Sequence, residues 1–227
     1  LRKMPIKNLF REFLFDIGFT GNVEALGKAK HFWDFLADEN GELGASAYNR
    51  QWRRWPRSGK GAEVANENLL SDHDFDQLRW AVNELKETRN SRRATLITTN
   101  PTAIKPGCPP CHLGVQFMPR GNYLDAMVPA RSNDMIVGFP LDIARYAIMV
   151  EVVAQMMDFE PGKLYMPSSN SHIYENCYDI AHELLTRKPK AECTVHINPK
   201  DMDSLELDDF CIDGYENPHP AIKVAVN

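Results

Sequence analysis

The chain has 227 residues, of which 43% are hydrophobic and 25% are charged, which is enough apolar material for one soluble domain with a single core. The net charge of -5 argues against a general nucleic-acid-binding protein, because such proteins carry a basic face. No stretch approaches the ~18 apolar residues of a membrane helix, and the N-terminal region is too charged for a signal peptide. We therefore expect a cytoplasmic protein, in the host cytoplasm if a phage encodes it.

The N-terminal third predicts two helices and a turn. Apolar residues follow one helical face over residues 6–17, which Gly18 ends, and a second helix is expected over residues 25–37. The Asn-Gly pair of residues 38–41 supplies the positive φ of a turn. Residues 48–56 interleave Trp and Arg, which we interpret as packed Trp beside solvated Arg rather than as a surface that stacks on bases. The chain starts at Leu1 without an initiator methionine, and we expect that a preceding segment is missing.

The middle of the chain predicts a mobile loop, a helix and three strands. Residues 57–71 read as the loop, and the spacing of Phe75, Leu78, Val82 and Leu85 predicts a helix that ends before Asn90. A β-branched run over residues 94–99 predicts a buried strand. Strands over 112–118 and 123–130 form a hairpin through Arg120-Gly121-Asn122.

The last third predicts a central buried helix that begins at Asp142 and is closed by Pro161-Gly162. Its expected apolar stripe consists of Ile143, Ala147, Val150, Ala154 and Met157. Another helix is expected from Ile173 to Leu185, and the remainder is strand-like.

Cys111 is the candidate nucleophile. Cys108 and Cys111 first suggest a redox pair or half a zinc site, but no second closely spaced pair and no thioredoxin-like context accompany them. The five cysteines are odd in number and irregular in spacing, as expected for reduced thiols. A nucleophilic thiol needs positive charge nearby, which Arg131 can supply while it also binds an anion. Strand alternation would point His112 away from Cys111, which disfavours a Cys-His protease dyad.

A series of motifs resembles the thymidylate synthase family over almost the whole chain from Glu12 onward. They occur in the family's order: Trp33-Asp34 to Gly44, Gln51-Trp52-Arg53, Ser91-Arg92-Arg93, Pro109-Pro110-Cys111-His112 with Gln116-Phe117, Arg131-Ser132-Asn133-Asp134, Gly138-Phe139-Pro140, His172-Ile173-Tyr174, and Gly214-Tyr215 with Pro218-His219-Pro220. The resemblance implies an α+β fold, with a large mixed sheet covered by helices on one face and a homodimer packed sheet to sheet. It also implies one-carbon transfer from 5,10-methylenetetrahydrofolate to C5 of a pyrimidine nucleotide, without a metal.

The resemblance also assigns roles to single residues. In the chemistry, Cys111 would attack C6 of the base, while Glu12 and Tyr48 would serve the C5 proton and the ordered water. Nucleotide contacts are implied for Arg131, Ser132, Gln116 and Asp142, for His172 and Tyr174 at the 3'-hydroxyl, and for Arg92 and Arg93 at the phosphate of the other subunit. Folate contacts are implied for Trp33, Asp134, Val137, Gly138 and Leu141. The family's further phosphate arginine lies upstream of Leu1.

Asp142 stands where the family's synthases have an Asn that reads uracil. A carboxylate only accepts hydrogen bonds, so it suits the 4-amino group of cytosine and an N3 that carries a proton in the activated base. Deoxycytidylate hydroxymethylases of the family show the same replacement. The alternative is that Asp142 only caps the following helix, although Asn would cap it equally well.

The tail is the second departure from the synthases. Residues 222–227 are shorter and more polar than the family's closing segment, and a looser lid favours water over hydride as the group that captures the methylene. The sequence therefore predicts a deoxycytidylate hydroxymethyltransferase. A methylating enzyme on dUMP or dCMP, or an inactive relative that binds folate or RNA, are the alternatives.

Overall fold

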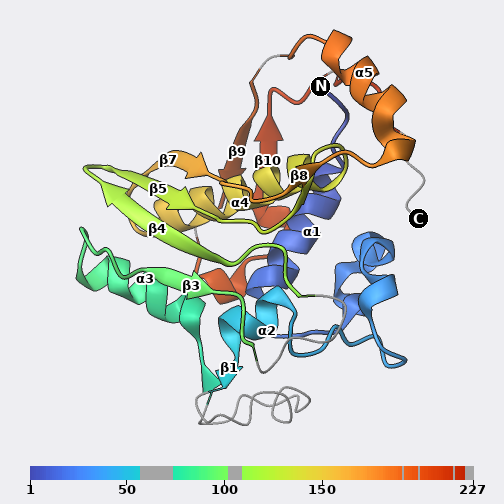
Figure 1. Ribbon diagram of the computed structural model, residues 1–227. Coiled ribbons are helices and arrows are strands. Elements are labelled where there is room, and N and C mark those ends of the chain that lie inside the picture. Colours follow the sequence, from blue (N-terminus) through green and yellow to red (C-terminus); the bar gives the residue numbers. More distant parts are fainter. Residues whose placement is uncertain (57–73, 102–108, 191, 199, 217, 223–227) are drawn as a thin grey trace.

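The computed structural model describes residues 1–56, 74–101, 109–190, 192–198, 200–216 and 218–222. A mixed sheet of four strands lies at its centre, in the order β3-β4-β5-β7 (Figure 1). The strands are β3 (Thr95–Ile97), β4 (Gly114–Arg120), β5 (Tyr123–Met127) and β7 (Glu160–Tyr165), and only β5 and β7 are parallel. The predicted mixed α+β fold is thus confirmed.

The β4–β5 hairpin follows from its sequence. Arg120 and Tyr123 are the last paired residues, and Gly121 adopts the positive φ of 62° that the turn requires. Along β4, Val115 and Phe117 face the core while Gln116 between them does not. The predicted hairpin is confirmed, although β4 begins and ends two residues later than expected and β5 ends three residues earlier.

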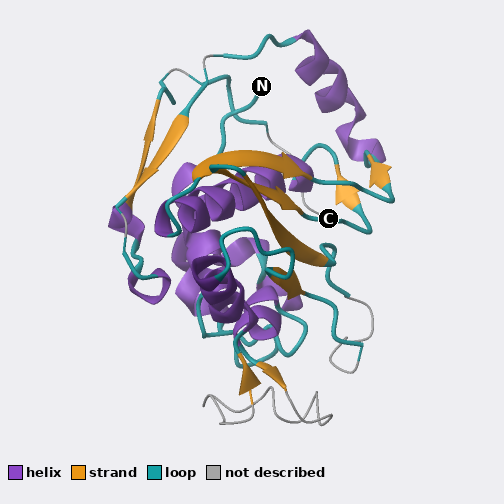
Figure 2. Ribbon diagram, turned by 90° about the vertical axis from the view of Figure 1, so that its left-hand side faces the viewer, coloured by secondary structure: helices purple, strands orange, loops and turns teal. Residues whose placement is uncertain are grey.

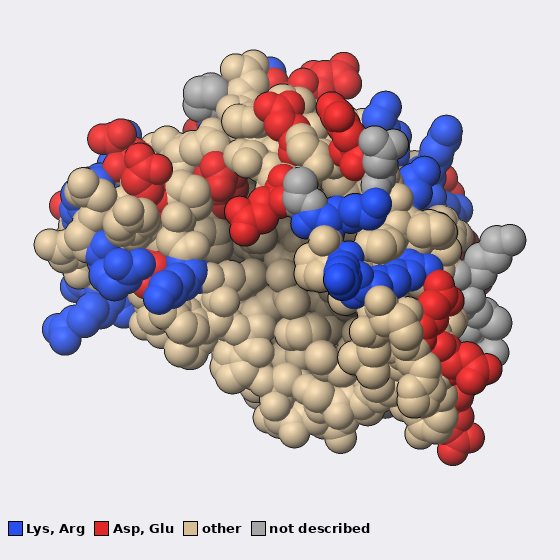
Figure 3. Space-filling model, turned by 90° about the horizontal axis from the view of Figure 1, so that it is seen from above, with Lys and Arg blue, Asp and Glu red and all other residues tan. Residues whose placement is uncertain are grey.

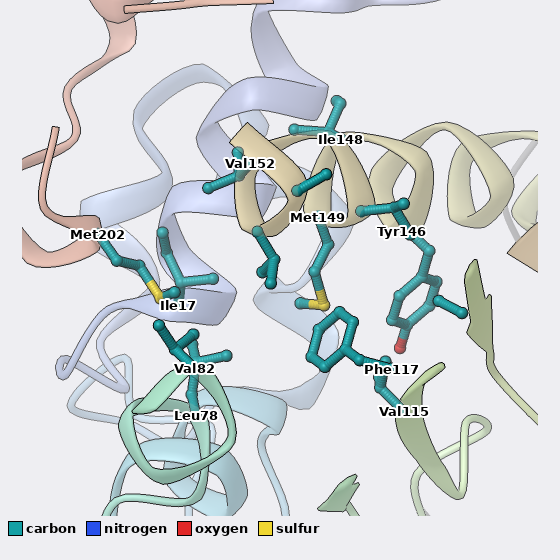
Figure 4. Packing of buried hydrophobic residues seen from close by; sticks show 14 of the residues in the cluster. Ile17, Leu78, Val82, Val115, Phe117, Tyr146, Ile148, Met149, Val152 and Met202 are labelled. Carbon is teal, nitrogen blue, oxygen red and sulfur yellow. The ribbon is translucent and has the colours of Figure 1, made fainter. Parts of the chain in front are cut away.

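Among the described residues, helices cover one face of this sheet and no helix covers the other (Figure 2). The two main helices are α1 (Ile6–Ile17) and α4 (Gly138–Met156), which contact each other. In the shared core, Tyr146 and Met149 of α4 point toward Phe117 of β4 (Figure 4). The predicted helix over residues 6–17 is confirmed.

The long helix corrects two predictions. It begins at Gly138, four residues before Asp142, so Asp142 lies inside the first turns and the capping alternative for it is wrong. It ends at Met156, and Pro161-Gly162 belongs to β7 instead of closing the helix. Ile143 and Ala147, which were predicted to belong to the buried stripe, are exposed. The helix is apolar on several sides, so the periodicity of its apolar residues did not identify the buried face.

The basic stretch of residues 48–56 differs from its prediction as well. Here α2 (Tyr48–Arg53) buries Trp52 as predicted, but Arg50, Arg53 and Arg54 are buried as well, not solvated. Each has a carboxylate partner supplied by the tertiary fold. The second predicted helix is also different, because residues 23–36 form the 3-10 helices η1 (Val23–Phe32) and η2 (Asp34–Leu36), with a kink at Gly27.

The remaining elements are short. They are β1 (Trp55–Pro56), β2 (Asp74–Phe75), α3 (Gln77–Glu87), β6 (Asn133–Asp134), β8 (Ser171–His172), η4 (Glu175–Cys177), α5 (Tyr178–Thr186), β9 (Thr194–Ile197), η5 (Met202–Ser204), η6 (Leu207–Asp209) and β10 (Phe210–Asp213). Phe75 therefore lies on a strand and not in the helix predicted for it. The loop predicted at residues 57–71 lies outside the described residues. Within those residues, no helix is long and apolar enough to cross a membrane.

Candidate active site

The candidate site lies where the sheet continues past its regular strands, at the end away from the β4–β5 turn. His112 pairs with Ala130, and Ala130 pairs with Ser168, through isolated bridges. Just beyond them, β6 and β8 pair in parallel and align Asp134 with His172. The motifs that contain His112, Asp134 and His172 therefore converge at one end of the sheet.

Cys111 and Arg131 meet in this extension. The Arg131 backbone amide donates to the Cys111 carbonyl (2.9 Å), which aligns the two side chains. Its guanidinium then donates to the carbonyls of Pro110 (2.9 Å) and Pro109 (2.6 Å) and lies 3.5 Å from Cys111 Sγ. Arg131 thus holds the loop that carries Cys111, and a cation at this distance is one that can stabilise a thiolate.

His112 takes part in a second, buried group with Tyr48. The His112 backbone amide donates to the Tyr48 hydroxyl oxygen (3.3 Å), which leaves the hydroxyl proton for His112 Nδ1 (3.1 Å). This arrangement assigns the ring proton of His112 to Nε2. His112 Nε2 lies 3.4 Å from Asp142 Oδ2, and this contact is electrostatic rather than a well-formed hydrogen bond. Burial raises the pKa of Tyr48, so it is a neutral phenol at physiological pH.

Asp142 is held from the other side by Arg145. Arg145 Nη2 donates to Asp142 Oδ1 (3.0 Å), and Arg145 Nη1 lies 3.1 Å from Asp16 Oδ2 on α1. Burial by itself would raise the pKa of Asp142, but His112 and Arg145 outweigh burial and the net shift is downward. Asp142 is thus an ionised carboxylate that only accepts hydrogen bonds.

Glu12 adds a further carboxylate to this group and links it to Trp33. Glu12 is 8% exposed, and burial raises its pKa against the opposing effects of Arg145 and a hydrogen bond donated by the Trp33 indole. Trp33 lies between η1 and η2, so this interaction brings the N-terminal 3-10 segment next to the site. The structure thereby brings Glu12, Tyr48 and Asp142 around one guanidinium.

A cavity of about 430 Å³ adjoins these groups through Val137 and Leu141. Arg2, Lys3 and Phe32 line other parts of it. The cavity thus combines apolar walls with two cations. Those features match a flat, largely apolar ring system that carries an anionic tail.

The turn between β6 and α4 borders this cavity. Asp134 Oδ1 accepts from the amides of Ile136 (3.0 Å) and Val137 (3.2 Å), which fixes the turn. A side chain at Gly138 would lie 3.7 Å from Asp134 and 3.8 Å from Asp142, so the glycine leaves the space between the two carboxylates open.

Three predicted nucleotide contacts lie on neighbouring surface segments. His172 and Tyr174 stack edge to face with ring centroids 5.0 Å apart, and His172 Nδ1 contacts Asn170 Oδ1 at 3.0 Å. Ser132 is half-buried and directly follows Arg131. This places two hydroxyl groups and an imidazole within the same surface as the Arg131 guanidinium.

Gln116, Arg92 and Arg93 are not joined to the Cys111 cluster. Gln116 lies on the outer side of β4 and donates to the Arg92 carbonyl (3.4 Å). Arg93 is bound to Glu84 of α3 (2.6 Å). Gln116 lies on an inner strand of the sheet, paired with Thr95 and Met127, and its predicted contact with the nucleotide stays a prediction.

Arg145 and Asp16 are site residues that the sequence did not single out. Their side chains meet across 129 positions, and neither lies in a motif that suggests the contact. The available signal was that an Asp and an Arg each lie within the apolar run of a helix. Charged residues are rarely buried without a partner, so this position indicates that each needs one. The residues 223–227 of the predicted open tail lie outside the described residues.

Charged side chains are dispersed over the face of the molecule that is seen from above in Figure 3. Seen from above, Lys and Arg side chains form separate groups interspersed with Asp and Glu, around a recess in the middle of this face (Figure 3). Across the described residues, no three His, Cys, Asp or Glu side chains come close enough together to hold a metal ion.

The comparison with protein families agrees with this geometry. The family model of thymidylate synthase matches residues 1–227, the whole length of the chain. Members of that family are one-carbon transferases that act on pyrimidine nucleotides with methylenetetrahydrofolate as co-substrate. Cys111, Arg131 and the buried carboxylates lie together at one end of the mixed sheet. By the match over its whole length, the chain belongs to the thymidylate synthase family.

Proposed function

We propose that this one-carbon transferase is a deoxycytidylate 5-hydroxymethyltransferase. The observation that carries the proposal is Asp142, which lies beside the Cys111-His112 segment and is held as a carboxylate by His112 and Arg145. An ionised carboxylate cannot donate a hydrogen bond to O4 of uracil, whereas it can accept from the amino group of cytosine and from a protonated N3. Discrimination by an unpaired polar group is large, commonly about 10⁴ or more in site-specific cases.

Cys111 would start the reaction on the nucleotide. Its thiolate adds to C6 of the base, which gives C5 carbanion character and lets it bond to the transferred carbon. The C5 proton then leaves toward the network of Tyr48 and Glu12. The bond between the transferred carbon and the folate nitrogen would break, so that tetrahydrofolate leaves and an exocyclic methylene remains on C5. Hydroxide from water would then add to this methylene while the Cys111 thiolate is eliminated from C6, and the protons from C5 and from water would end on the two folate nitrogens.

The cavity lined by Val137 and Leu141 is the proposed folate site. Methylenetetrahydrofolate supplies the one-carbon unit, at the oxidation level of formaldehyde. In this chain Val137 and Leu141 would pack on its ring, Asp134 would face the pterin, and Arg2 and Lys3 are placed to balance an anionic tail. Net transfer uses one water and releases tetrahydrofolate, so no redox partner is needed.

Sugar and phosphate recognition is proposed for the neighbouring surface. Arg131 and Ser132 would bind the 5'-phosphate, for which an arginine fork is well suited. His172 and Tyr174 would hydrogen-bond the 3'-hydroxyl. We expect a deoxyribonucleotide because the sequence around these residues resembles that of the deoxynucleotide enzymes.

The proposed homodimer is supported by the open sheet face. Its outer side carries Ile97, Tyr123, Met127 and Tyr165, which are between 36% and 52% exposed. An apolar patch of this kind commonly marks an interface. A partner packed on it would lie next to Arg92 and Arg93, which could then reach the partner's phosphate site.

The dimer has its own test. Cys111→Ala and the double variant Arg92→Ala with Arg93→Ala should each be inactive alone. If they are mixed under conditions that exchange subunits, a fraction of the wild-type activity should return, because one intact site forms per heterodimer. Absence of recovery despite subunit exchange would contradict shared sites.

The substrate test is incubation with dCMP, dUMP or CMP plus methylenetetrahydrofolate, with product masses read directly. We expect 5-hydroxymethyl-dCMP and no rise in dihydrofolate absorbance. Asp142→Asn should move the preference toward dUMP, and Cys111→Ala should abolish tritium release from C5 while nucleotide binding persists. A wild-type enzyme that turns over only dUMP would overturn the proposal.

A methylating enzyme is the second candidate, and Trp33 favours it. Trp33 is held by its hydrogen bond to Glu12, and an aromatic side chain beside the transferred carbon would shield it from water. Methylation would be recognised by a product 16 mass units lighter than the hydroxymethyl nucleotide and by stoichiometric formation of dihydrofolate.

A further inference from the structure

Arg145 occupies a position that the proposed chemistry has not yet used. It follows Asp142 by three residues on α4, is 4% exposed, and spans Asp142 and Asp16 with separate nitrogens, 3.0 and 3.1 Å away. The guanidinium is planar and always charged, so two fixed carboxylates define both its place and its orientation. Asp142 is therefore oriented from the protein side before any base arrives.

The remaining capacity of Asp142 matches one base. A carboxylate has about four acceptor sites. Arg145 occupies one on Oδ1, and His112 Nε2 lies against Oδ2. At least two sites are left, which is the number required by the amino group and the protonated N3 of cytosine.

The protonation state of Asp142 decides whether this preference holds. A neutral carboxyl group has one donor and one acceptor, the same pattern as an Asn amide, and could therefore read uracil. Glu12 and Asp16 on α1 are further carboxyl groups in the same cluster. A negative charge on Asp142 raises the pKa of both, which shows that charges on these three groups repel one another. Without Arg145, that crowding would favour a protonated Asp142.

We propose that Arg145, anchored by Asp16, is a specificity-determining positioning residue that keeps Asp142 ionised and oriented and so prevents the enzyme from accepting uracil. The inference rests on the proposed cytosine specificity of the same site. Arg145 acts through Asp142 and is not assigned a contact with substrate. The groups that face this carboxylate pair are Glu12, Tyr48, His112 and Tyr146, from α1, α2, the segment before β4 and α4.

The test compares kcat/KM for tritium release from dCMP and dUMP between pH 5.5 and 8.5. Arg145→Gln should lower the dCMP:dUMP ratio about tenfold or more, the size expected when a charged hydrogen bond is lost. The loss should be greatest at low pH, where Asp142 can protonate. Arg145→Lys keeps a cation and should restore most of the ratio.

Two further variants separate this role from a structural one. Arg53 also bridges two carboxylates and is 0% exposed, but lies outside the site, so Arg53→Gln should leave the ratio unchanged. In an Asp142→Asn background, Arg145→Gln should have no additional effect on the ratio, since it acts through that carboxylate.

The outcomes are distinct. If wild type prefers dCMP and folded Arg145→Gln keeps the wild-type ratio at every pH, the inference on Arg145 is wrong while the proposed function stands. If wild type does not prefer dCMP, the proposed function fails first. Should Arg145→Gln not fold, Asp16→Ala takes its place, because it removes the oxygen that anchors Arg145: a ratio lowered several-fold supports the inference, and an unchanged ratio overturns it.

Discussion

The protein contains two buried arginines that each bridge two carboxylates, and they differ in their surroundings. Arg53 pairs with Asp76 and Asp203, whose side chains are 25% and 34% exposed. Arg145 pairs with Asp16 and Asp142, whose side chains are 5% and 21% exposed. Asp16 is therefore the least hydrated of the four carboxylates and Asp203 the most hydrated, while Asp76 and Asp142 are exposed to a similar extent.

The balance of charge differs as well. Around Arg53, the neighbouring Arg79 shares Asp203 and binds Asp201, so two guanidinium groups serve three carboxylates. Around Arg145, one guanidinium serves Asp16, Asp142 and the nearby Glu12. Burial raises the pKa values of Asp16 and Glu12 around Arg145, and that of Asp76 beside Arg53. Two raised carboxyl pKa values around a single cation are typical of functional sites. A well-compensated cluster near the surface is instead typical of a structural role.

The largest expected effect is on stability at the outlying cluster. Arg53→Met should lower the free energy of unfolding by about 3 kcal/mol, because it leaves two carboxylates without their buried partner. Urea unfolding measures the loss. The dCMP:dUMP ratio of the folded variant should stay at the wild-type value, and a changed ratio would remove the distinction between the two clusters.

The second prediction concerns pH. Burial raises the pKa of Asp16 to about 7, against the opposing effect of Arg145, from an ordinary value of 3.8. The folded protein therefore binds a proton at Asp16 that the unfolded chain releases, and this contribution to stability falls as pH rises from about 4 to about 7. Wild type should lose about 2.6 kcal/mol relative to Asp16→Asn between pH 5 and pH 8.

Asp201 provides the control for that experiment. The hydrogen bonds from Arg79 lower the pKa of Asp201 to about 2, so its contribution is complete above pH 4 and is lost only in acid. The difference in stability between wild type and Asp201→Asn should thus be constant from pH 5 to pH 8. A flat difference for Asp16→Asn too would show that Asp16 is ionised throughout.

Much of the fold could be predicted because local sequence determines it. Leu9, Phe13 and Ile17 share one face of α1 and are all buried, and Gly121 supplies the turn of the hairpin. Predictions failed where the partners are distant. Arg53 was expected in solvent, yet its partner Asp203 lies 150 positions away. On α4 the apolar residues surround the helix, so Ile143 could not be distinguished from buried neighbours.

The candidate site, like the fold, could be predicted where sequence motifs mark its residues and could not be predicted where distant residues meet. Cys111 and Arg131 could be connected from sequence because they lie in motifs, and the strand extension brings them to 3.5 Å. The pairing of Asp16 with Arg145 could not be predicted, because it depends on how α1 crosses α4. Motifs therefore named the residues for the reaction, and only the fold revealed the residues that set the charge of the base-reading carboxylate.

The smallest expected effect is at Arg79, where the outlying cluster meets solvent. Arg79 donates to both Asp201 oxygens (2.8 and 3.0 Å) and has a side chain that is 34% exposed. Arg79→Ala should lower the free energy of unfolding by about 0.5–1 kcal/mol, because the ion pairs that it removes are partly exposed. The better helix propensity of Ala within α3 offsets part of this loss. In 0.5 M NaCl this difference should shrink because exposed pairs are screened, whereas the cost of Arg53→Met should persist since its cation is buried. If both costs responded to salt alike, burial would not be what separates the two arginines, and the contrast with Arg145 would have to rest on charge balance alone.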